Sequence, residues 1–146
     1  MNGKYIKLVL NHTTHVAELI ILQKTMFHDY FIEYLKAIEI INNDENIRVC
    51  LIYSNIKLFT AGLDLKSAAT WFYDMGQLSE TKRSHQFYKQ IKLWQKAFDS
   101  PRLSSKIFIV AINSHCIGGG IDLISGCDIR ICSNDAKFSI AEIKLS

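Results

Sequence analysis

The chain has 146 residues, a net charge of +3 and 49% hydrophobic residues, so it can form one domain, residues 1–146, and is too short for two. The basic residues are spread along the chain, which argues against a nucleic-acid partner. No apolar run approaches the roughly 20 residues that cross a bilayer, and the N-terminus lacks the layout of a signal or transit peptide. We therefore expect a soluble intracellular protein with no membrane insertion.

The cysteine pattern indicates a reducing environment. The chain has four cysteines, none of them in a Cys-x-x-Cys pair, and three lie within apolar segments. Buried free thiols are therefore favoured over disulfides or metal ligands. The histidines show no His-x-x-x-His spacing and no matching acid, so we expect no metal site. The cysteines are Cys50, Cys116, Cys127 and Cys132.

The first third of the chain predicts a hairpin followed by an amphipathic helix. Two β-prone runs, 5–10 and 16–22, flank the polar segment Asn-His-Thr-Thr-His, which is typical of a turn. A helix is expected from near Thr25, its candidate N-cap, to the Asn-Asn-Asp segment at 42–44. The apolar positions at helical spacing should be buried: Phe27, Tyr30, Phe31, Tyr34, Leu35, Ile38 and Ile41.

Strands and helices then alternate to the end of the chain, which favours an α/β fold with parallel strand pairing. The expected strands are short apolar runs rich in β-branched residues, and Gly76 is a stop signal for one helix. The predicted strands are 47–53, 107–112, 128–132 and 137–141; the predicted helices are 64–75, 79–98 and a short one that ends near Cys127. Along helix 79–98 the expected buried stripe is Phe87, Ile91, Trp94 and Phe98.

Two loops that contain glycine each connect an expected strand to the start of an expected helix. They are FTAGLDL at 59–65 and CIGGGIDL at 116–123. A helix N-terminus offers unpaired backbone N–H groups, and glycine lets a ligand approach them closely. Two such termini that face each other would clamp one oxygen atom, which is the geometry of an oxyanion hole. Alone, the triple glycine fits a tight turn equally well; a Walker phosphate loop is disfavoured because no Lys-Ser or Lys-Thr follows it.

These two motifs, with the following CDIRIC segment, resemble the crotonase (enoyl-CoA hydratase/isomerase) superfamily, and most closely its delta-3,5-delta-2,4-dienoyl-CoA isomerases. The resemblance covers nearly the whole chain and implies a ββα spiral core. It also implies that the backbone N–H groups of Leu63 and Gly119 form the oxyanion hole for a thioester carbonyl. The other substrate-binding positions that it implies are Ala61, Gly62, Asp64, Leu65 and Gly118.

Two acidic residues distinguish activities within this superfamily. Asp122 lies in the second motif, and Glu142 follows 20 residues later. Isolated, Asp122 would be a first-turn acid favoured by the helix dipole and Glu142 a solvated strand residue. The resemblance implies instead that Glu142 shuttles a proton with an aspartate eight residues further on, while Asp122 lies beside them. Asp64 and Asp128 are interpreted as structural.

The resemblance sets the functional expectation. It implies an acyl-CoA isomerase of unsaturated fatty-acid β-oxidation, in the mitochondrial or peroxisomal matrix, with coenzyme A as part of the substrate and no permanently bound cofactor. Two alternatives stay open, an enoyl-CoA hydratase and a catalytically inactive family member. The shuttle aspartate, the last turns of the spiral and the C-terminal helices of the family's trimers and hexamers would fall beyond Ser146. We therefore expect a truncated core that is inactive alone.

The sequence also departs from the family pattern in three places. The segment 22–26 is shortened where an Asn-Arg-Pro sequence and a downstream Asn-Ala are usual, which puts the adenine end of the coenzyme A site in doubt. A Lys-Pro-Val segment is replaced by residues 105–107, and the glycine before the second loop is replaced by Ser114.

Overall fold

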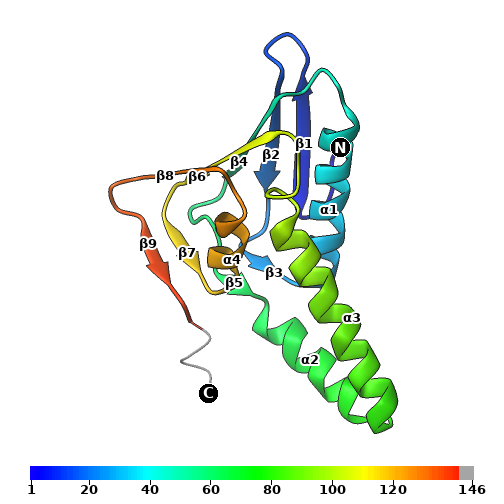
Figure 1. Cartoon of the computed structure of the whole chain (residues 1–146). Helices are drawn as coiled ribbons and strands as arrows, with labels where there is room; N and C mark the ends of the chain where they lie inside the picture. The colour runs from blue at the N-terminus through cyan, green and yellow to red at the C-terminus, as the bar shows by residue number, and fades with distance from the viewer. Residues whose placement is uncertain (142–146) are drawn as a thin grey trace.

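The computed structural model describes residues 1–141, which form a five-stranded sheet with helices on one face (Figure 1). The strand order is β1-β2-β4-β6-β8; β1 and β2 form the predicted antiparallel hairpin, and the other neighbours pair in parallel, as the alternation predicted. The strands are β1 (Ile6–Asn11), β2 (Val16–Ile21), β4 (Val49–Ser54), β6 (Ile107–Ile112) and β8 (Ile129–Cys132).

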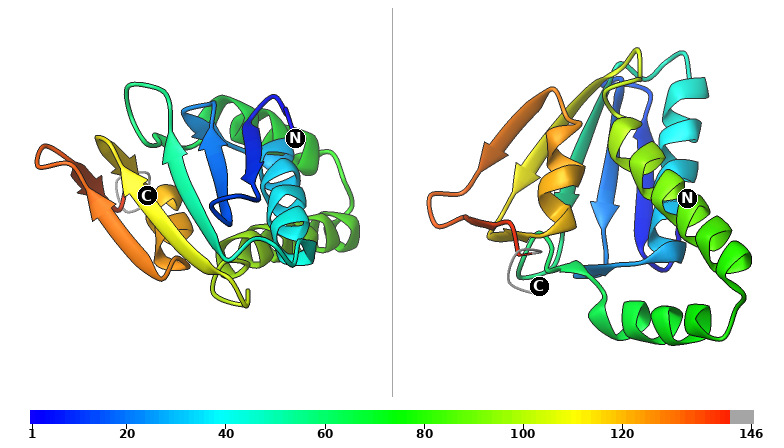
Figure 2. Two further views of the ribbon diagram at one scale, coloured as in Figure 1. Left: turned by 90° about the horizontal axis from the view of Figure 1, so that it is seen from above. Right: turned by 60° about the horizontal axis from the view of Figure 1, so that its bottom comes forward.

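The helices differ in how much of this sheet they cover. Three of them, α1 (His28–Asn43), α3 (Glu80–Asp99) and α4 (Gly119–Ser125), pack on the same face of the sheet (Figures 1 and 2). Helix α2 (Leu65–Gly76) and the first half of α3 project below the sheet as a helical hairpin. Among residues 1–141, no helix combines the length and apolar character needed to cross a membrane.

Two small parallel sheets connect the helices to the main sheet. Strand β3 (Thr25–Met26) pairs with β5 (Gly62–Leu63), and β7 (His115–Ile117) pairs with β9 (Lys137–Ser139). The prediction that Thr25 caps the first helix is wrong, because Thr25 lies in β3 and α1 begins at His28 after Phe27. The hydroxyl of Thr25 instead donates to the Asp64 carboxylate at 2.9 Å.

The core lies between the sheet and the helices, and most of the predicted helix stripe is in it. Tyr30, Phe31, Tyr34, Ile38 and Ile41 on α1 are buried, whereas Phe27 and Leu35 are half-buried. The two tyrosine hydroxyls lie in apolar surroundings, so desolvation raises the pKa of both phenols well above the ordinary value.

Helix α3 departs from its predicted stripe. Ile91 is 44% exposed, while Gln90 and Ala97 are the buried residues of this helix. At this level of the helix Gln90 faces α1, where its Oε1 lies 2.9 Å from His28 Nδ1, and the neighbouring Ile91 remains exposed. The expectation of buried free thiols is confirmed for three cysteines and wrong for Cys132, which is exposed on the edge strand β8.

Candidate active site

The two glycine loops meet through their backbones. The Thr60 N–H donates to the His115 carbonyl at 3.0 Å, and the Ile117 N–H donates to the Thr60 carbonyl at 3.2 Å. Next to this ladder, a Cβ atom on Gly62 would lie 2.7 Å from the Ile117 carbonyl oxygen. The two strand-to-helix turns are therefore in direct contact, as the oxyanion-hole hypothesis requires.

The first loop is fixed by the hydroxyl of Thr60. This buried side chain donates to the Lys24 carbonyl at 3.0 Å and accepts from the Gly62 N–H at 3.0 Å. The Ala61 N–H donates to the same Lys24 carbonyl at 2.7 Å. Gly62 has φ = +83°, a left-handed conformation that side chains rarely adopt, so glycine is required at this turn.

Asp64 begins helix α2 as its N-cap. One carboxylate oxygen accepts from the Ser67 N–H at 2.8 Å, and the other accepts from the Thr25 hydroxyl at 2.9 Å. These hydrogen bonds, with the one from Ser67 as the largest cause, hold the pKa of the Asp64 carboxyl below its ordinary value. The structural interpretation of Asp64 is thus supported by its contacts, and Leu65, which follows it, is 56% exposed.

The second loop is shaped by closely packed glycines. Gly118 has φ = +55°; its N–H donates to the Ser139 carbonyl at 2.8 Å, and its carbonyl accepts from Ile121 at 2.7 Å. Gly119 is the first residue of α4, where an N–H group has no partner within the helix. At Gly120 a Cβ atom would lie 2.2 Å from the Thr60 methyl carbon, so a side chain would collide with the first loop.

One cavity of about 240 Å³ lies where the loops meet, and it collects three of the predicted site residues. Leu63 from the first loop, Gly119 from the second and Asp122 from the first turn of α4 all line it. The other lining residues are Met26, Phe31, Trp94 and Phe98. Ala61, Gly62, Asp64, Leu65 and Gly118 shape the two turns but are not among the lining residues. Glu142 lies outside the described residues.

Three aromatic side chains form one part of the wall of this cavity. The ring of Phe31 packs edge-on against Phe98, with 5.5 Å between ring centroids, and lies 6.2 Å from the ring of Trp94. Helical spacing predicted that these three side chains, one on α1 and two on α3, are buried. Such spacing does not show whether a buried side chain also borders a cavity. Met26 was missed entirely, because nothing in a two-residue strand marks its side chain as a wall of the site.

The described residues that line the cavity include one carboxyl group, that of Asp122. Cys116 lies behind the second loop, and burial raises the pKa of its thiol to about 12, so the nucleophilic thiolate does not form near neutral pH. Among the described residues, no group of His, Cys, Asp or Glu is arranged to hold a metal ion. The cavity is instead lined by residues of the two turns, by the acidic residue Asp122 and by an apolar wall.

Comparison with known proteins identifies relatives in the superfamily that the two sequence motifs resemble. Residues 22–146 match the profile of a family described as enoyl-CoA hydratase/isomerase. A mitochondrial delta(3,5)-delta(2,4)-dienoyl-CoA isomerase of Dictyostelium discoideum is 38% identical over 147 aligned residues, covering 98% of this chain and 50% of the relative. The peroxisomal isomerase of Arabidopsis thaliana is 35% identical, covering 95% and 48% of the two chains. The chain spans about half the length of these curated relatives.

A solved structure supports the fold assignment. The crystal structure of an enoyl-CoA hydratase/isomerase from Marinobacter aquaeolei aligns with a TM-score of 0.84 and 24% identity, over 98% of this chain and 54% of that one. The α/β arrangement described above is therefore that of a crotonase fold, with about half of the solved chain represented. This likeness concerns the fold.

Proposed function

Because this chain belongs to the enoyl-CoA hydratase/isomerase family, we propose that its cavity binds the thioester end of a dienoyl-CoA and supports movement of its double bonds. The single observation that carries the proposal is that Leu63, Gly119 and Asp122 line one cavity. Dienoyl-CoA isomerases are among the relatives at 38% and 35% identity, which favours this substrate class. A mitochondrial or peroxisomal location is proposed on the same basis.

The backbone N–H groups of Leu63 and Gly119 would hold the thioester oxygen. When a proton leaves the carbon next to the thioester, C2, the electron pair moves onto that oxygen. Fixed donors in a water-poor pocket stabilise the charge as it develops, and loss of one donor costs about 3 to 4 kcal/mol of barrier. The N-terminal end of α4 adds the positive end of its peptide dipoles to the same point.

The acids would move the proton. In a 3,5-dienoyl thioester, removal of a C2 proton gives an enolate conjugated through C6. Return of a proton at C6 completes the 2,4-dienoyl product, so no oxidant, reductant or water is consumed. We assign Glu142 as the main shuttle by family resemblance, with Asp122 as the neighbouring acid in the cavity. The aromatic wall of Phe31, Trp94 and Phe98 would pack on the acyl chain and exclude water.

A paired assay tests this proposal. Because residues 1–146 are expected to be inactive alone, conversion of 3,5- to 2,4-dienoyl-CoA is measured for a form of the chain extended by the C-terminal half that its relatives carry, and for the Asp122→Asn and Glu142→Gln variants of that form. Acid–base catalysis contributes about 10²–10⁴-fold, so each variant should lose at least a hundredfold in kcat while acyl-CoA binding persists. Asp74→Asn, on the exposed surface of α2, is the matched control and should keep the wild-type rate. A variant that keeps more than a tenth of the rate is not a proton carrier.

Hydration of a 2-enoyl-CoA is measured beside isomerisation, because hydratases also occur among the relatives, at 30% identity. Faster hydration than isomerisation would replace the proposal with a hydratase function at the same cavity. Acyl-CoA binding without turnover of either substrate would indicate that this chain is a catalytically inactive member of the family.

A further inference from the structure

Met26 contacts both of the turns that carry the proposed oxyanion donors. Strand β3 has two residues, and its parallel register pairs Met26 with Leu63 of the first turn. The Met26 carbonyl accepts from the N–H of Asp64, the residue after Leu63, at 2.9 Å. The backbone of Met26 therefore holds the backbone of the first turn at the position of Leu63.

The side chain of Met26 reaches the second turn. It is 1% exposed and lines the cavity together with Leu63 and Gly119. A Cβ atom on Gly119 would lie 3.4 Å from Met26 Cε and 3.8 Å from Phe98 Cζ, so the tip of Met26 lies beside the first residue of α4. Methionine suits this place, because its unbranched and flexible side chain can fill an irregular gap.

The aromatic wall residues of the cavity lack this double contact. Phe31, Trp94 and Phe98 lie on α1 and α3, and among residues 1–141 none of the three shares a backbone hydrogen bond with either glycine turn. Phe98 approaches Gly119 through its ring alone. Met26 is thus the wall residue that joins one turn through its backbone to the other through its side chain.

The distance between the two turns depends on what fills the space between them. Helix α4 has seven residues, and the N–H of its first residue, Gly119, moves with the helix. A shorter side chain at position 26 would remove packing contacts beside this N–H, and neighbouring groups relax only partly into such a gap. A misplacement of about 1 Å can cost about 100-fold in rate, so this contact bears on the chemistry of the site.

We infer that Met26 is a positioning residue of the oxyanion hole, which sets the distance between the Leu63 and Gly119 N–H groups. This role rests on the function proposed above, because both N–H groups must hold one thioester oxygen. The thioether side chain of Met26 has no proton to transfer, so it acts through the two backbone donors. A substitution at Met26 should therefore change the polarisation of the carbonyl more than the affinity for acyl-CoA.

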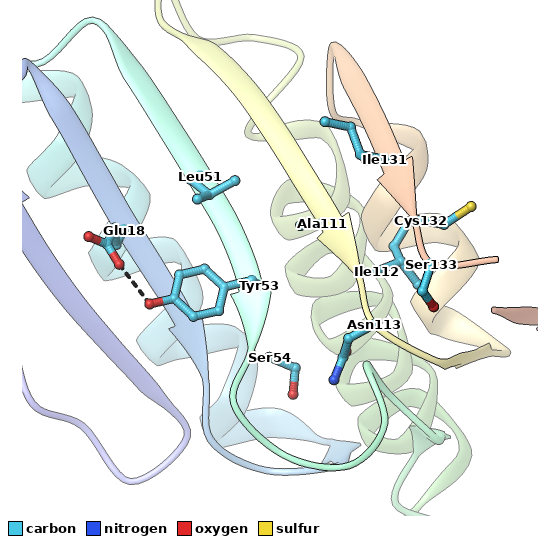
Figure 3. Close-up of a pocket in the computed structure, with 10 residues that line it drawn as sticks. All are labelled: Glu18, Leu51, Tyr53, Ser54, Ala111, Ile112, Asn113, Ile131, Cys132 and Ser133. Atoms are coloured by element: carbon cyan, nitrogen blue, oxygen red, sulfur yellow. Dashed lines mark hydrogen bonds between the residues drawn. The ribbon is translucent and has the colours of Figure 1, made fainter. Parts of the chain in front are cut away.

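Two leucines outside the cavity supply matched controls. Leu19 on β2 is fully buried and is not among the residues that line the cavity. Leu51 on β4 stands on the face of the sheet away from the helices, beside a groove of about 590 Å³ that no residue of the two turns lines (Figure 3). Leu→Ala and Met→Ala substitutions in protein cores destabilise over the same range, so Leu19→Ala matches the packing loss of Met26→Ala.

The test uses the chain extended by the C-terminal half that its relatives carry. Difference infrared spectroscopy gives the carbonyl stretching frequency of bound hexanoyl-CoA, and the dienoyl-CoA assay gives kcat. Met26→Ala should lose most of the wild-type lowering of this frequency and about tenfold or more in kcat, while the dissociation constant changes by less than about threefold. Met26→Leu conserves volume and should keep most of the lowering, as should Leu19→Ala and Leu51→Ala.

Circular dichroism establishes that each variant is folded. Met26→Val replaces Met26→Ala if the alanine variant unfolds, because valine favours a strand and still lacks the tip of the side chain. A full lowering in Met26→Ala, with the lowering lost in Gly119→Pro, which removes the Gly119 N–H, overturns the positioning role and leaves the proposed function intact. An equal loss in Leu19→Ala shows a general effect of core packing and also overturns the positioning role. A wild type that does not lower the frequency contradicts the proposed function itself, and the positioning role falls with it.

Discussion

The first glycine loop is held in place by polar side chains, whereas the second depends on positions that carry no side chain. In the first loop, Thr60 and Asp64 use their oxygens to fix the backbone and to cap α2. In the second loop, Gly118 supplies a left-handed turn and Gly120 lets the backbone pass beside Thr60. One site is thus built by hydrogen bonding on one side and by close packing on the other, and the two sides should respond differently to substitution.

The largest expected effect on stability is at Gly120. In Gly120→Ala the new Cβ would lie 2.2 Å from the Thr60 methyl carbon and 3.1 Å from Cys116 Sγ. Thr60 cannot move without breaking its hydrogen bonds, so the free energy of unfolding should fall by about 2 to 3 kcal/mol, the range of an overpacked core. Urea denaturation at a fixed protein concentration measures the loss.

Two variants make this prediction specific to the contact between the loops. Gly119→Ala adds the same methyl group one residue earlier, where the nearest atom is Met26 Cε at 3.4 Å, and it should change stability by less than about 0.5 kcal/mol. Thr60→Ser removes the methyl carbon and keeps the hydroxyl, so it should rescue much of the Gly120→Ala loss in a double-mutant cycle. Additive losses would show that the two loops do not press on each other.

A smaller effect is expected from the first loop, and it should depend on pH. Asp64→Ala removes the N-cap of α2 and should cost about 1 kcal/mol, whereas Asp64→Asn keeps an accepting oxygen and should cost about 0.5 kcal/mol. Folding lowers the pKa of Asp64, so its charge stabilises the protein above the unfolded pKa of about 4. That contribution is lost as the pH falls through the folded pKa.

Urea midpoints of wild type and Asp64→Asn should therefore differ by a constant amount above about pH 5 and converge as the pH falls through the lowered pKa of Asp64 in the folded state. A gap that is independent of pH would mean that the carboxylate charge does not stabilise the cap. The Gly120→Ala loss involves no titrating group of the first loop, so it should remain over the same pH range.

The sequence predicted the parts of this site that depend on local chemistry. Gly76 and the two glycine motifs mark where helices and turns must change direction, and the strands and helices follow them within a few residues. Asp64 was expected to be structural at a helix start, and it caps α2. The fold class followed from the alternation of apolar strands with helices, because parallel pairing needs such crossovers.

Other features depend on contacts between distant segments and have no local signal. Thr25 has the residue type of an N-cap, but pairing of β3 with β5 takes it into a strand and gives its hydroxyl to Asp64. Ile91 fits a helical stripe, yet it is exposed because Gln90, and not Ile91, contacts α1 at this level of α3. The three-residue strand β7 is too short to show a period, and its partner β9 lies more than twenty residues away. Side-chain periodicity predicts which residues turn inward but not whether they meet a core or a cavity.

The most direct test of the account is whether the Gly119 N–H polarises a bound thioester carbonyl. Gly119 is the first residue of α4, a position where proline is tolerated, so Gly119→Pro removes this N–H while Gly119→Ala keeps it. The carbonyl stretching frequency of bound hexanoyl-CoA, whose saturated chain cannot isomerise, is measured by difference infrared spectroscopy. A lowered frequency in wild type and Gly119→Ala, with most of that shift lost in Gly119→Pro, is the predicted result. An equal shift in all three proteins would contradict the assignment of the oxyanion hole.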